Sequence, residues 1–77
     1  MVARSSLPSS NEVIFVVEEV AEGGYIARAI GTSIYTEVDS LADLHVQVRD
    51  AVHCHFEESD RPKIIRLHFV REEIIAA

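Results

Sequence analysis

A chain of 77 residues with 13 acidic and seven basic side chains forms one small domain with a formal net charge of −6. This balance argues against direct nucleic-acid binding, which requires a basic surface to displace counterions from phosphates. The single cysteine, Cys54, rules out a disulfide within the chain and fits a reducing compartment. The longest apolar run, Val13 to Val17, is far shorter than a bilayer span. The sequence therefore predicts a cytoplasmic protein.

The amino-acid composition of the chain changes at Asn11. Residues 1–10 are polar and serine-rich and lack the apolar stretch of a signal peptide, so we expect a disordered tail there and a single domain over residues 11–75. Val13 to Val17 are β-branched or aromatic without interruption, which is typical of a strand covered on both faces. Gly23-Gly24 tolerates the positive φ of a tight hairpin, and Tyr25 to Ile30 return as the second strand.

A third strand and a helix follow the hairpin. Gly31 to Ser33 form a short connection, and Ile34 to Val38 read as a half-exposed strand. Ser40 is a favourable N-cap, with Asp43 three residues later as in a weak capping box. Apolar residues then recur at helical spacing and predict a helix over Leu41 to Glu57. The expected buried stripe consists of Leu41, Leu44, Val48, Ala51, Val52, His55 and Phe56.

The last strand is predicted over Lys63 to Arg71, after Ser59 to Pro62 end the helix. Its residues alternate between Ile65, Leu67 and Phe69 on one face and Ile64, Arg66, His68 and Val70 on the other.

These elements predict an α+β fold with the order strand-strand-strand-helix-strand. The first three strands form an antiparallel meander, and the helix provides a crossover that is right-handed almost without exception. The crossover lays the fourth strand beside the first, which gives a four-stranded mixed sheet of order 3-2-1-4 with the helix on one face. The other face stays uncovered, and either Ile14 and Val16 or Phe15 and Val17 point toward it. An exposed apolar sheet face is a docking surface or an oligomer seam.

Two groups of residues invite a chemical reading, and we expect no metal, cofactor or catalysis from either. Carboxylates at strand ends suggest a metal site, but catalysis with two metals needs several acids held around shared ions on a rigid frame. These acids flank separate turns and are Glu18, Glu19, Glu22, Glu37 and Asp39. His53, Cys54 and His55 fan out at about 100° intervals on a helix and do not converge on one ion. Cys54 also lacks a base to activate it.

The stretch from Glu12 to Phe56 resembles the HicB-like antitoxin family. The resemblance rests on a hairpin, Glu22-Gly23-Gly24-Tyr25, placed ahead of Asp39-Ser40-Leu41 and an amphipathic helix. It implies a partial ribonuclease-H-like fold and a small acidic antitoxin whose partner is a basic, HicA-like endoribonuclease toxin. Two features depart from the family. The connection at Gly31 to Ser33 is short, and the sequence ends after the fourth strand without a DNA-binding extension, so we expect no direct DNA binding.

Charge, the uncovered face and the resemblance together predict a non-catalytic interaction module. In this hypothesis the acids meet a basic toxin and a tyrosine supplies an apolar anchor. The candidate partner-binding residues are Glu18, Glu19, Glu22, Tyr25, Tyr35, Glu37 and Asp39. The alternative is a homo-oligomeric structural domain without a toxin, since a domain this small gains stability from association.

Overall fold

The protein is described by a computed structural model over residues 11–77; the predicted disordered tail at residues 1–10 lies outside the described residues. Five elements follow one another in the predicted order. They are β1 (Glu12–Glu19), β2 (Tyr25–Ala29), β3 (Tyr35–Val38), α1 (Leu41–His55) and β4 (Ile64–Val70). No helix within residues 11–77 has the length and apolarity that crossing a bilayer requires.

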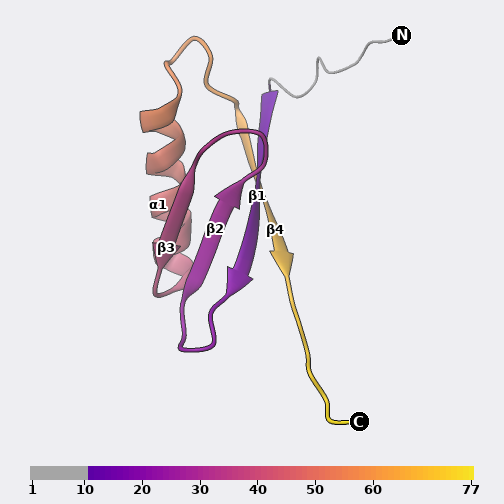
Figure 1. Ribbon diagram of the computed structural model, residues 1–77. Coiled ribbons are helices and arrows are strands. Elements are labelled where there is room, and N and C mark those ends of the chain that lie inside the picture. Colours follow the sequence, from indigo (N-terminus) through magenta and orange to yellow (C-terminus); the bar gives the residue numbers. More distant parts are fainter. Residues whose placement is uncertain (1–10) are drawn as a thin grey trace, which may run out of the picture.

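The four strands form one mixed sheet in the order β3-β2-β1-β4, as predicted. β1 pairs antiparallel with β2 and parallel with β4, and β2 pairs antiparallel with β3. The helix lies against one face of this sheet, on the side of β2 and β3, while β4 forms the opposite edge (Figure 1). β1 and β2 are therefore the two inner strands of the sheet, and β3 and β4 are its edges.

The core lies between α1 and alternate residues of the sheet. Phe15 is completely buried and is the largest of the fully buried side chains. Three buried helix residues at helical spacing, Leu44, Val48 and Val52, belong to the same core cluster. The remaining core residues are Val13, Val17, Ala27 and Ile34. This arrangement decides between the two predicted alternatives: Phe15 and Val17 face the helix, so Ile14 and Val16 occupy the uncovered face.

The hairpin between β1 and β2 depends on two glycines in the left-handed region. Gly23 has φ 101° and Gly24 has φ 99°, which side-chain-bearing residues rarely adopt. The turn is closed by hydrogen bonds from Gly23 N to Val20 O and from Val20 N to Gly24 O, both 2.9 Å. Gly24 also lies beside the end of β3, where a Cβ atom would approach Val38 O to 2.5 Å. The two glycines are thus needed for two reasons. The turn requires positive φ at both positions, and the approach of β3 leaves no room for a side chain at Gly24.

Element ends differ from the prediction by one or two residues. The helix ends at His55, because Phe56 adopts an extended backbone (φ −109°, ψ 140°). β3 begins at Tyr35, although Ile34 is buried and its carbonyl accepts a hydrogen bond from Ala29 N. Leu41, predicted within the buried stripe, is 46% exposed, and His55 is exposed as well. Both lie at the ends of the helix, where less of the sheet is available to cover them.

Ser40 caps the start of the helix. Its Oγ accepts a hydrogen bond from Asp43 N at 3.1 Å, and its own backbone is extended (φ −145°). This bond satisfies one of the amide groups that the first helical turn leaves without a partner.

Replacing Ser40 with alanine is expected to lower the free energy of unfolding by about 1 kcal/mol, because Asp43 N loses its acceptor. Urea unfolding followed by circular dichroism measures the change. Ser33→Ala is the control, since Ser33 is exposed in a loop and is expected to have little effect. Equal losses in the two variants would rule out a specific capping contribution.

Candidate functional site

The face of the sheet opposite α1 carries an ordered mixture of apolar and charged side chains, which we call the open face. Strand alternation assigns its residues from the register of each pair. They are Glu12, Ile14, Val16 and Glu18 of β1, Ile26 and Arg28 of β2, Tyr35 and Glu37 of β3, and Ile64, Arg66, His68 and Val70 of β4.

The centre of the open face is apolar but partly shielded. Ile14, Val16 and Ile26 are half-buried even though no helix covers them. Arg66 lies opposite Ile14 on β4, and Arg28 lies opposite Val16 on β2. The aliphatic part of an arginine side chain covers neighbouring apolar surface while its guanidinium stays in water. The two arginines therefore stand beside the apolar centre of the open face, which carries charged as well as apolar side chains.

Each arginine is held by a glutamate of β1. Glu12 Oε1 accepts hydrogen bonds from Arg66 Nη2 at 2.7 Å and from Arg66 Nε at 3.1 Å. Glu18 Oε1 accepts one from Arg28 Nη2 at 3.2 Å. The hydrogen bond to Glu12, together with the attraction between the two charges, raises the pKa of Arg66 above its ordinary value. The two ion pairs thus stand at opposite ends of β1 with Ile14 and Val16 between them.

Three of the seven predicted partner-binding residues lie together on the open face. Glu18 is half-buried and paired with Arg28. Tyr35 is 59% exposed opposite Arg28, and Glu37 is exposed opposite Ile26. Together with Arg28 they form a polar margin along β2 and β3, beside the apolar centre.

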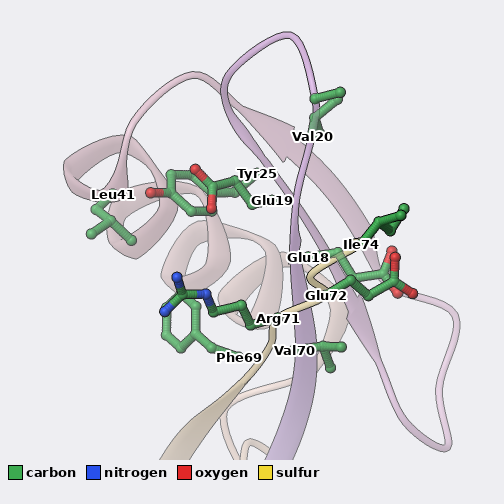
Figure 2. Close-up of a pocket in the computed structure, with 11 residues that line it drawn as sticks. Glu18, Glu19, Val20, Tyr25, Leu41, Phe69, Val70, Arg71, Glu72 and Ile74 are labelled. Carbon is green, nitrogen blue, oxygen red and sulfur yellow. The ribbon is translucent and has the colours of Figure 1, made fainter. Parts of the chain in front are cut away.

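The other four predicted residues lie elsewhere. Tyr25 and Glu19 are directly opposite each other on the helix side of the sheet, and Figure 2 shows them near Leu41. The Tyr25 ring meets the Phe69 ring edge-on, with centroids 6.5 Å apart. Glu22 is exposed in the hairpin turn, and Asp39 is exposed just before the helix. The predicted set is therefore divided between both faces and two connections.

A hollow of about 760 Å³ surrounds the end of β1 where the two faces meet. Tyr25, Leu41 and Phe69 line it on the helix side, and Glu18, Glu72 and Ile74 line it on the other (Figure 2). A smaller hollow of about 180 Å³ lies between α1 and β4, lined by His45, Val48, Arg49, Ile65 and Leu67. β4 thus borders both hollows, because α1 covers the sheet mainly over β2 and β3.

The histidines and the cysteine of α1 are dispersed on its surface. His53, Cys54 and His55 are all exposed. His55 Nε2 is 2.7 Å from Thr32 Oγ1, which ties the end of the helix to the connection before β3. Within residues 11–77, no three His, Cys, Asp or Glu side chains come together in a group that could hold a metal ion.

Sequence reasoning missed two participants in the open face, Arg28 and Glu12. The local pattern does not distinguish the two faces of β1, because both alternating series have polar ends around an apolar centre. The even series runs from Glu12 to Glu18, and the odd series runs from Asn11 to Glu19. Arg28 and Glu12 join the open face through cross-strand pairing, which brings opposite charges together.

Two proteins that share one family name are similar to the chain. A UPF0150 protein from Archaeoglobus fulgidus is 58% identical over 52 residues, which span 68% of this chain and 77% of that protein. A UPF0150 protein from Thermotoga maritima is 36% identical over 70 residues, which span 91% of this chain and 99% of that protein. No family model and no solved structure matches the chain significantly.

Proposed function

The chain belongs to the UPF0150 family, and from that premise we propose that it is a non-catalytic interaction module of the HicB-like antitoxin type. Its partner is a small basic endoribonuclease of the HicA-like class, which it occludes by direct contact. The observation that carries the proposal is the open face, with its half-buried apolar centre between two exposed ion pairs. The proposal also rests on the resemblance of the hairpin and helix start to that family.

The open face offers a basic partner both kinds of contact that stable interfaces use. Tyr35 is 59% exposed and supplies a side chain that a partner pocket desolvates. Glu37 is exposed beside Ile26 and attracts a cation of the partner. The net charge of −6 adds a long-range attraction that speeds encounter with a basic protein.

The two ion pairs within the open face can be replaced by ion pairs with a partner. A guanidinium or ammonium group of the partner competes with Arg66 for Glu12 and with Arg28 for Glu18. When either arginine is displaced, its aliphatic part leaves Ile14 or Val16 and uncovers apolar surface for the partner. Exposed ion pairs of this kind contribute little to the stability of the free protein, so their exchange has a low energetic cost.

Co-expression with a small basic chain encoded beside this one is expected to give a complex that no longer cleaves RNA. Glu37→Lys is expected to weaken the complex about tenfold or more, because it places a cation where the partner is basic. Asp50→Lys on the outer side of α1 is the matched control, with the same change of charge on an exposed residue. Titration calorimetry or surface plasmon resonance measures both affinities.

If both variants weaken binding equally, the overall charge rather than the open face is responsible. If no small basic neighbour forms a complex, the homo-oligomeric structural domain becomes the better explanation.

A further inference from the structure

Exposed apolar side chains are concentrated near the end of the described chain. Among residues 11–77, nine large hydrophobic side chains are exposed, and five of them lie between Ile64 and Ile75. Ile74 is 91% exposed and Ile75 is 84% exposed, while Ile64 and Phe69 are about half exposed at 50% and 51%. This density of apolar surface in twelve residues exceeds the scattered exposure that a monomer surface normally shows.

The same residues follow an edge of the sheet. β4 is the last strand in the order β3-β2-β1-β4, and within the described residues no strand pairs with its outer side. Residues 71–77 continue from β4 as an extended segment that runs beyond the other strands (Figure 1). An open strand edge of this length is a template for another strand.

We propose that β4 and the segment up to Ile74 pair antiparallel with the same residues of a second copy, about a twofold axis at Phe69. The resulting dimer has one continuous sheet in which the two β4 strands are central. A twofold axis makes the contact isologous, so that each pairing occurs twice.

The register is selected by the side chains that it brings opposite one another. Centring on Phe69 places Arg66 opposite the second copy's Glu72 and Ile64 opposite the second copy's Ile74, all on the side of the open face. Opposite charges and apolar pairs directly across an antiparallel ladder stabilise it. A shift of the centre to Val70 would place Arg66 opposite Ile74 and leave both pairings unmade.

Charge complementarity favours a second copy as the occupant of this edge. The chain as a whole is acidic, so two copies repel each other at a distance. Locally, β4 carries Arg66 and His68, and the segment after Arg71 begins with Glu72 and Glu73. Antiparallel pairing brings the basic strand of each copy against the acidic segment of the other, and it does so on both sides of the axis.

The dimer goes beyond the proposed antitoxin function and is independent of it. Pairing at β4 extends the sheet in its own plane, so Ile14, Val16 and Ile26 stay uncovered and available to a different protein. Arg66 takes part in both contacts, so the two proposals are tested at residues that they do not share: Glu72 for the dimer and Glu37 for toxin binding.

The first test is the mass of the full chain in solution by light scattering and analytical ultracentrifugation across a dilution series. We expect a dimer for the unaltered chain. Glu72→Arg is expected to raise the dissociation constant about tenfold or more, because it places an arginine opposite Arg66 twice. Glu73→Arg is the matched control, since the same charge change falls opposite Ile65, and it is expected to retain the dimer. A monomeric unaltered chain, or equal weakening by both variants, overturns the proposal.

The second test is the register itself. In a Cys54→Ser background, Phe69→Cys places two thiols across the axis and is expected to form an intermolecular disulfide under mild oxidation. Val70→Cys in the same background faces His68 and is expected to crosslink far less. Circular dichroism checks that both variants fold. Faster crosslinking through Val70→Cys, or crosslinking through neither variant, contradicts pairing about Phe69.

Discussion

Replacing Gly24 with alanine is expected to lower the free energy of unfolding by about 3 kcal/mol or more. The added Cβ atom would stand 2.5 Å from Val38 O, a backbone atom that no side-chain rotation can move away. Tyr25 pairs with Val38 in the ladder between β2 and β3, so relief of the clash requires β3 to shift. The backbone strain of a side chain at φ 99° is added to this cost.

Gly23→Ala is the matched control for this prediction. Gly23 has nearly the same φ, 101°, but a Cβ there meets nothing within 4 Å, so only the backbone strain remains, at about 1–2 kcal/mol. Chemical unfolding of both variants, followed by circular dichroism, gives the difference. Equal losses at the two positions would mean that the approach of the hairpin to Val38 has no energetic weight.

Replacing Phe15 with alanine is expected to cost about 3–5 kcal/mol, the largest effect of any single truncation in this chain. Phe15 is fully buried, and its removal leaves a cavity in the core that also contains Leu44, Val48 and Val52. A small domain has a total stability on the order of 5 kcal/mol. The variant is therefore expected to be largely unfolded at 37 °C.

Val16→Ala tests whether the large loss of stability is specific to the side of β1 that faces the helix. Val16 is the next residue but lies half-buried on the open face, so its truncation is expected to cost only about 1 kcal/mol. Thermal and urea unfolding of the two variants compare the faces directly. A cost at Val16 similar to that at Phe15 would show that the open face is also packed, as in an assembly that covers it.

The fold could be predicted from the sequence because each element carries its own local signal. The apolar spacing of Leu44, Val48 and Val52 predicts the helix and its buried side, and Gly23-Gly24 predicts the hairpin. Strand order followed from connection lengths and was confirmed. Element ends were less predictable, since Phe56 continues the helical pattern but has an extended backbone.

The candidate site was predictable only in part, because sequence proximity does not determine which face a side chain occupies. Glu18 and Glu19 are neighbours in the chain, yet one lies on the open face and the other on the helix side beside Tyr25. The run from Val13 to Val17 offers no alternation of polarity within itself. Cross-strand partners such as Arg66 and Glu12 also depend on a register between distant segments, which no local pattern specifies.

The position of β1 in the sheet also determines when this strand can complete its pairing during synthesis on the ribosome. Its antiparallel neighbour β2 follows at once, but its parallel neighbour β4 begins with Ile64 opposite Glu12, after the helix has been synthesised. At ribosomal rates of about 5–20 residues per second, the edge of β1 that pairs with β4 stays unpaired for several seconds while the intervening residues are synthesised. Throughout that interval the backbone edge of β1 that later pairs with β4 has no partner strand, and a fragment that stops before β4 keeps this edge unpaired.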